Sequence, residues 1–392
     1  MKRVHTSWEI FWRFLSLGCF CFGGPAAHLG YFHRYFVERL NWLDAEQYGQ
    51  LVALSQFLPG PGSSQVGFAI GLQRAGLAGG IAAFIGFTLP SFCLMLGFFA
   101  LSSQHNLDFL TLASGLKLLA VVVVSDAVLS MYKHFCQSHS SRIIAVLSAS
   151  VLIFFSAIWL QILVLSMAAT FGMLYHTHLK LGSVPRENLP TTQSLWLSLG
   201  LFFTLFVISC WVVYFSATDS SHLAHMAAQF YHSGSLVFGG GHVVLPLLQQ
   251  NVGSALTSEQ FLSGYAAAQA VPGPMFSFAT FLGAQLVPLT PISGAIIATL
   301  ALFLPGLLLV FALHQHWAHL SNIPRVAGAT LAINAAVVGL LFSALVDPII
   351  KQAVHQISDI VALLIGFVLL RWLKIPILLL ITFYLAYAYL IR

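Results

Sequence analysis

Two kinds of glycine–proline break interrupt the apolar sequence, and both occur twice. In the first half the breaks are residues 22–25 (FGGP) and 59–61 (PGP), and in the second half they are 238–241 (FGGG) and 272–274 (PGP). Glycine and proline end one helix and begin another, and each new helix start offers free backbone N–H groups and about half a positive charge. The breaks therefore favour the binding of a small anion.

Polar side chains beside the breaks add candidate ligands for such an anion. Ser63 and Ser64 lie in the first turn after one PGP break, and Ser277 lies in the first turn after the other. Gln56 and Gln269 each precede a PGP break by three residues. There an amide either binds cargo or pairs with a carbonyl group that the break leaves free. The alternative interpretation is that the glycines and prolines only allow tight helix packing.

Histidines follow the glycine pairs within one turn in both halves, at His28 and His242. The positive end of a helix disfavours the imidazolium ion, so we expect His28 to be neutral in an empty site. A bound dianion would favour the imidazolium form and would link cargo binding to proton binding.

Lys117 is a cation well inside an apolar run, residues 109–131. An ionisable residue inside a membrane is a functional candidate, with snorkelling as the alternative. Asp126 falls on the opposite face of the same helix and is a poor partner for Lys117, while Glu259, at a helix start, is interpreted as structural. The candidate substrate-binding residues are Gly23, Gly24, Pro25, His28, Gln56, Gly60, Pro61, Ser63, Ser64, Lys117, Gly239, Gly240, His242, Gln269, Gly273, Pro274, Ser277 and Asn334, the last at roughly the place of Lys117 in the second half.

The composition predicts that membrane-spanning helices carry these residues. Of 392 residues, 58% are hydrophobic and 7% are charged, whereas soluble domains carry about 25% charged residues. Apolar runs long enough to span a bilayer recur along the chain, and the 16 Lys and Arg residues form no patch typical of nucleic-acid binding. We therefore expect an all-α polytopic membrane protein in contact with lipid and without a nucleic-acid partner.

The chain contains two related halves. Matching residues stay 213–216 positions apart from the FGG motifs to a later LP motif, and chance matches would not hold this register. A polar stretch at 180–192 and an apolar run at 195–214 have no counterpart in the first half, so they predict a linker and an extra linking helix. The predicted units are an N-terminal transport repeat (1–178), the linker with its helix (179–215) and a C-terminal transport repeat (216–392).

The distribution of Lys and Arg predicts that the two halves are inverted. If each break forms a re-entrant hairpin, the cations of the first half lie on one side, which the positive-inside rule makes cytoplasmic together with the N-terminus. Residues 187–324 contain no Lys or Arg, as expected if the hairpins of the second half open outside. Kinked helices that span the membrane at each break are the alternative. The predicted spans are 76–101, 109–131, 143–156, 158–177, 195–215, 290–314, 326–346, 355–370 and 374–391.

These motifs resemble the chromate ion transporter family in its long, two-domain form. The resemblance implies efflux of chromate across the bacterial inner membrane, driven by the proton gradient. Leu118 and Leu119 stand where the family often has proline and alanine. The direction of the Lys117 side chain is therefore left open. The similar segments are FGGPAAH (22–28), FVER (36–39), WLD (42–44), QFLPGP (56–61), SSQVG (63–67), GFTLP (86–90), FGGGH (238–242), QAVPGP (269–274) and NAAVV (334–338).

Inverted repeats with broken helices favour a secondary transporter. A polytopic enzyme is one rival, but the sequence contains neither a clear acid–base pair nor a metal motif, and no cofactor is expected. A channel is the other rival. The residues leave the cargo open among chromate, sulfate and other tetrahedral dianions, and they leave the oligomeric state open, a homodimer included.

Overall fold

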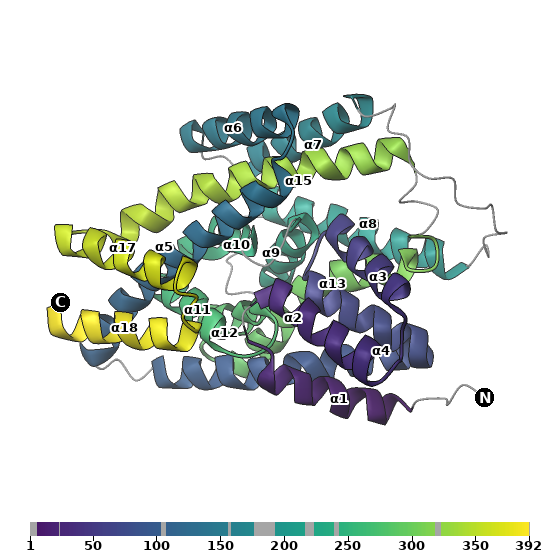
Figure 1. Cartoon of the computed structure of the whole chain (residues 1–392), viewed down its shortest axis with the longest axis horizontal. Helices are drawn as coiled ribbons and strands as arrows, with labels where there is room; N and C mark the ends of the chain where they lie inside the picture. Colours follow the sequence, from purple (N-terminus) through teal and green to yellow (C-terminus); the bar gives the residue numbers. More distant parts are fainter. Residues whose placement is uncertain are drawn as a thin grey trace.

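The computed structural model describes residues 6–22, 24–102, 107–155, 158–175, 193–215, 223–238, 243–317 and 323–391. Every regular element in these ranges is helical (Figure 1). Five helices in the described part are long and apolar enough to cross a membrane, and several shorter apolar helices accompany them. The expectation of an all-α polytopic membrane protein is confirmed.

The first half begins with short helices on either side of the breaks. Asp44 accepts a hydrogen bond from the backbone N–H of Gln47, so a capping box fixes the start of α3. The second half repeats this cap with Thr257 and Gln260 at the start of α11. These elements of the first half are α1 (Ser7–Phe20), α2 (Gly24–Phe32), η1 (His33–Arg39), α3 (Ala45–Phe57) and α4 (Gly62–Ser102), and those of the second are α9 (Leu223–Leu236), α10 (Val244–Val252), η3 (Gly253–Ala255), α11 (Ser258–Ala270), η4 (Met275–Ser277), α12 (Phe278–Leu286) and α13 (Pro291–Leu313).

The long helix α4 is a hairpin of two helices. Gly76 has φ 61° and breaks the helical path, and a Cβ on Gly71 would collide with the backbone of Gly79. In the second half, α12 and α13 form the same hairpin, with Gly283 against the backbone of Gly294. These turns lie at the predicted starts of the spans 76–101 and 290–314.

The first helix of each half packs closely on the helix that carries a proline. A Cβ on Gly18 of α1 would lie 2.6 Å from the carbonyl oxygen of Phe87 in α4. Gly234 of α9 meets the carbonyl oxygen of Leu302 in α13 in the same way. Figure 1 shows α1 and α4 side by side. The two halves therefore share their packing as well as their sequence motifs.

The remaining helices exchange partners between the halves. Helix α15 packs on α6 and α7 of the first half, while α5 packs on α17 and α18 of the second half. Figure 1 shows α15 beside α6 and α7, and α5 meeting α17 and α18 at the opposite end. This exchange interlocks the halves. The bounds are α5 (Leu107–Phe135), α6 (His139–Phe154), α7 (Ile158–Tyr175), α15 (Pro324–Ala344), η5 (Leu345–Ile350), α16 (Lys351–Ala353), α17 (Ile357–Arg371) and α18 (Ile377–Ile391).

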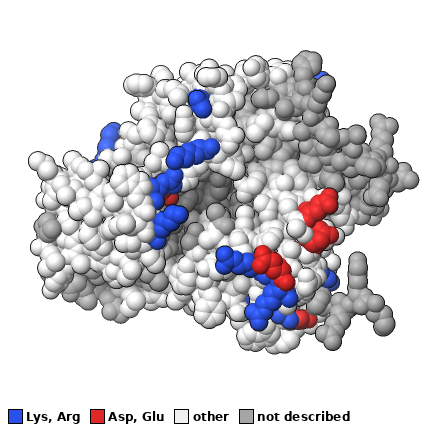
Figure 2. Space-filling model, viewed as in Figure 1, with Lys and Arg blue, Asp and Glu red and all other residues white. Residues whose placement is uncertain are grey.

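Helix α8 (Gln193–Phe215) lies on the outside of the bundle against α9 and α13. Trp196 and Trp211 expose 73% and 65% of their surface, as expected for side chains that face lipid. Figure 2 shows the Lys and Arg side chains of one face as small groups from its upper to its lower part, beside wide uncharged areas. A surface of this kind suits a protein surrounded by hydrocarbon.

Candidate functional site

The breaks of the two halves meet through a pair of backbone hydrogen bonds. The N–H of Gly60, in the PGP break of the first half, donates to the carbonyl of Val237 at 2.7 Å. The N–H of Gly273, in the PGP break of the second half, donates to the carbonyl of Cys21 at 2.9 Å. Val237 and Cys21 each lie just before the FGG motif of their own half. The PGP break of each half is therefore bonded to the residue before the FGG motif of the other half. We call the place where these segments meet the junction.

The two glycines of the junction have conformations that other residues rarely adopt. Their φ angles are 124° for Gly60 and 95° for Gly273, in the range where a Cβ causes strain. A Cβ on Gly60 would lie 2.9 Å from the Cα of Gly306, and a Cβ on Gly273 would lie 3.1 Å from the Oγ of Ser91. Gly306 and Ser91 each follow a proline inside a long helix, so the proline-containing helices form the walls of the junction.

Gln65 joins the break to this wall in the first half. Its Nε2 donates to the carbonyl of Pro59 at 2.8 Å and to that of Gly306 at 3.3 Å, while its buried Oε1 has no partner. Gln65 was not among the predicted binding residues, although it lies in the SSQVG segment of the family resemblance. Its place between the first PGP break and the wall helix α13 depends on tertiary packing.

His28 connects the first break to the junction. It is fully buried, with Nε2 3.2 Å from the carbonyl oxygen of Cys21 and Nδ1 3.2 Å from Oγ of Ser63. A carbonyl only accepts hydrogen bonds, so Nε2 carries the proton and a neutral ring accepts the Ser63 hydroxyl at Nδ1. The carbonyl of Cys21 thus holds both His28 and Gly273 of the other half.

Two serine hydroxyls at the junction are buried and unpaired. Ser64 and Ser277 occupy equivalent positions after the two PGP breaks, are 2% and 0% exposed, and have no hydrogen-bond partner for Oγ. The Nε2 of Gln269 is also buried without a partner, whereas Gln56 is half-buried. Buried polar groups are normally satisfied, so these unused donors are candidates for binding a ligand that accepts hydrogen bonds.

Lys117 is not at the junction. Its Nζ lies 3.2 Å from Oε1 of Glu259, in the first turn of α11, whereas Gly273 follows the last turn. Helix α11 has 13 residues, which at ~1.5 Å per residue separates its ends by about 20 Å. Lys117 is the one buried Lys or Arg among the described residues. Asp126 pairs with Arg371 at 2.8 Å, which agrees with its predicted position on the helix face opposite Lys117.

The other candidates lie in α2, in α15 or outside the described residues. Gly24 and Pro25 begin α2 directly after the first break, and Gly24 has φ 77°. Asn334 is buried in α15, and its Oδ1 has no partner. Four predicted residues lie outside the described part of the chain, namely Gly23, Gly239, Gly240 and His242.

The donor set of the junction is neutral. Its unused donors are the hydroxyls of Ser64 and Ser277 and the amide of Gln269, and within the described ranges no group of three or more His, Cys, Asp or Glu residues could hold a metal ion. Such donors bind an anion by hydrogen bonds and by the positive ends of helices rather than by full charges.

Comparison with known sequences agrees with the two-fold construction. The profile of the family described as chromate transporter matches residues 8–173 and again residues 224–390. The chromate transport protein of Pseudomonas aeruginosa is 27% identical over 348 residues, which cover 86% of this chain and 80% of that protein.

The chromate transport protein of Cupriavidus metallidurans is 25% identical over 382 residues, 95% of this chain and 90% of that protein. A probable chromate transport protein of Synechococcus elongatus is 28% identical over 373 residues, 91% and 87% of the two chains. No solved structure matches the chain significantly. With both halves matched by the same profile, the chain belongs to the chromate transporter family.

Proposed function

We propose that the protein is a secondary active transporter that exports a tetrahedral oxyanion, with chromate as the cargo, across the bacterial inner membrane with coupling to protons. The observation that carries this proposal is the junction, where two breaks from each half are tied together by the Gly60–Val237 and Gly273–Cys21 hydrogen bonds. The matched relatives are named as transport proteins, which supports a carrier over a membrane enzyme.

In this proposal the dianion binds between the two PGP breaks. The hydroxyls of Ser64 and Ser277 donate to it from opposite halves, because both are buried and have no other partner. Helix starts add backbone N–H groups and partial positive charge. Lys117 lies outside the junction, and in this proposal it binds the anion on its way there. The arriving dianion would replace Glu259 as the counter-ion of Lys117.

Proton coupling is assigned to His28. When His28 is protonated, Nδ1 also becomes a donor, so Ser63 must accept from the ring and its own proton becomes free to point toward the cargo. If the proton leaves together with the dianion, the complex has a net charge of about −1, so the membrane potential favours its export, whereas an inside-alkaline pH gradient opposes it. An inside-negative membrane potential drives such a complex outward by ~2.3 kcal/mol per 100 mV.

Inside-out vesicles with separately imposed pH gradient and potential test this proposal. Labelled chromate should accumulate in a saturable manner, faster with an interior-positive potential, and sulfate should compete because its shape and charge are nearly the same. The His28→Gln variant should keep the response to potential and lose the response to pH. Flux that does not saturate would indicate a channel, and an unchanged pH profile in His28→Gln would remove His28 from the mechanism.

Competition also separates the cargo alternatives. If sulfate is accumulated and chromate only inhibits weakly, sulfate becomes the cargo of the same junction. If neither anion is transported although the protein is folded, the proposed function is wrong.

A further inference from the structure

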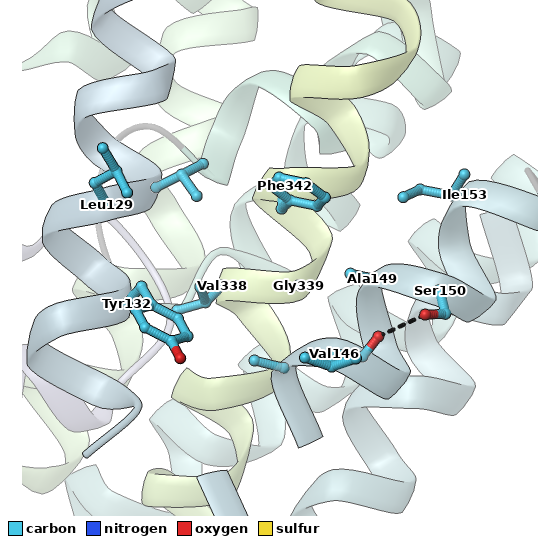
Figure 3. Close-up of a pocket in the computed structure, with 11 residues that line it drawn as sticks. Leu129, Tyr132, Val146, Ala149, Ser150, Ile153, Val338, Gly339 and Phe342 are labelled. Atoms are coloured by element: carbon cyan, nitrogen blue, oxygen red, sulfur yellow. Dashed lines mark hydrogen bonds between the residues drawn. The ribbon is translucent and has the colours of Figure 1, made fainter. Parts of the chain in front are cut away.

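An apolar groove lies between α5, α6 and α15 (Figure 3). Its volume is about 390 Å³. In Figure 3, α15 forms the floor and α5 and α6 form the two walls. The lining residues are Val128, Leu129, Tyr132, Ala145, Val146 and Ala149, with Ser150, Ile153, Val338, Gly339 and Phe342 beside them.

The groove offers almost no hydrogen-bonding group to an occupant. The hydroxyl of Ser150 donates to the carbonyl of Val146 in its own helix at 2.9 Å. Val146 and Phe342 remain 61% and 42% exposed, so the groove is open to its surroundings. Gly339 sets its depth, because a Cβ there would lie 2.7 Å from the backbone N of Ala149 and would push α15 away from α6.

A second, polar cavity lies on the same three helices next to the groove. It has a volume of about 180 Å³ and sits where α5 ends and α6 begins. Serine hydroxyls and the side chains of His134 and Gln137 line it. In Figure 3 the hydroxyl of Tyr132 points toward this end of the groove. The two cavities together therefore have one apolar part and one polar part.

The charge near the polar cavity is positive. Lys133 precedes its lining residue His134, and Arg142 follows its lining residue Ser141. Lys133 is exposed, and Arg142 folds back on the carbonyl of Cys136 at 3.1 Å while also remaining exposed. No Asp or Glu lines either cavity within the described ranges. An anionic head group fits this end.

We propose that this site binds an anionic phospholipid, with one acyl chain in the groove and the phosphate in the polar cavity between Lys133 and Arg142. Lipid is the occupant that matches both parts at once, because one molecule joins a hydrocarbon chain to an anionic head group. A second copy of this chain fits less well. A two-fold dimer would place this concave groove against itself, and neither copy would offer the ridge to fill it.

The test uses the purified full-length protein and measures the retention of added phosphatidylglycerol and phosphatidylcholine by native mass spectrometry. Ser150→Phe fills the groove, and Leu147→Phe is its matched control, because Leu147 is 59% exposed on the same helix but does not line the groove. Lys133→Gln removes a cation from the polar end, and Arg34→Gln removes an exposed cation elsewhere as its control.

We expect phosphatidylglycerol to be retained more strongly than phosphatidylcholine. Lys133→Gln should weaken this retention about fivefold, as one cation at a membrane surface contributes, and Ser150→Phe should weaken the retention of both lipids. Leu147→Phe and Arg34→Gln should behave like the wild type. Equal retention of the two lipids, or loss of dimers instead of lipid in Ser150→Phe, would overturn the proposal. Should Ser150→Phe fail to fold, the comparison of Lys133→Gln with Arg34→Gln still decides.

Discussion

At the level of single residues, Ser64 and Ser277 bear most directly on cargo binding. Both hydroxyls are buried and unpaired at equivalent positions of the two halves. Removing a buried hydroxyl that has no partner does not cost stability, whereas a hydrogen bond to a charged group contributes about 1.5–3 kcal/mol. Ser64→Ala and Ser277→Ala should therefore weaken chromate binding by these amounts without lowering the unfolding temperature.

Competition binding and thermal unfolding of the purified variants measure both effects. Ser235→Ala is the matched control, since Ser235 is equally buried but its hydroxyl donates to the carbonyl of Tyr231 at 2.8 Å. It should leave chromate affinity unchanged. If Ser64→Ala binds chromate like the wild type, the junction does not hold the anion through this hydroxyl.

The ion pair of Lys117 and Glu259 joins α5 of the first half to α11 of the second. Lys117 is buried, while Glu259 has a side chain that is 46% exposed. Glu259→Gln should destabilise the protein by about 1–3 kcal/mol, because it leaves a buried cation without its counter-ion in a partly solvated pair. Lys117→Gln should cost less, because water can solvate the carboxylate that remains.

A double-mutant cycle on thermal unfolding tests this asymmetry. The Lys117→Gln/Glu259→Gln double variant should be more stable than Glu259→Gln alone. Equal stability of Glu259→Gln and the wild type would mean that the pair is a solvated surface contact.

At the level of elements, the backbone of the PGP breaks is the decisive feature. Gly273 has φ 95°, and a Cβ there would lie 3.1 Å from the Oγ of Ser91. Gly273→Ala should cost about 1–2 kcal/mol for the strained backbone and should lower chromate flux, because α11 and η4 would change their angle at the junction. Adding Ser91→Gly to the Gly273→Ala variant should restore part of the flux. Position 91 would then carry a glycine, as position 306 does in the other half.

The matched control for this variant is Gly49→Ala in α3. Gly49 is helical, and nothing lies within 4 Å of a Cβ placed on it. Alanine there should stabilise the helix by up to about 1 kcal/mol and leave flux unchanged. Flux is compared in vesicles that contain equal amounts of Gly273→Ala, of its combination with Ser91→Gly, and of Gly49→Ala. Normal flux in Gly273→Ala would mean that this break serves helix packing and not transport.

At the level of the whole molecule, the inverted arrangement predicts on which side each turn lies. In a background without native cysteines, a cysteine in place of Ala255 should react with an impermeant thiol reagent in intact spheroplasts. A cysteine in place of Gln137 should react only after permeabilisation. Both residues are exposed, Ala255 at the end of η3 before α11 and Gln137 between α5 and α6. Labelling of both from outside, or of neither, would contradict the inversion.

The interlocked helices give a physical reason for the two-fold construction. Each half supplies a long helix to the other, as α15 does to α6 and α7 and α5 does to α17 and α18. The apolar faces of these helices are therefore covered only when both halves are present. One side of the junction also comes from each half, through the Gly60–Val237 and Gly273–Cys21 hydrogen bonds.

The sequence by itself determined the helical membrane class, the two halves and the places of the breaks. These features depend on local physics: apolar runs must be helical in lipid because backbone groups there need internal partners, and PGP motifs interrupt a helix wherever they occur. The caps at Asp44 and Thr257 are likewise local, because each side chain bonds the backbone three residues further on.

Only the tertiary structure decided which breaks meet and which charges pair. The sequence placed Lys117 with the breaks because both lie at membrane depth, but depth does not specify which face of α5 meets which neighbour, and α11 brings Glu259 to it instead. Gln65 and Ser91 became visible as parts of the junction only through Gly306 and Gly273, more than 180 positions away in the chain. Contacts of this kind arise from the packing of whole helices, which no local pattern of residues records.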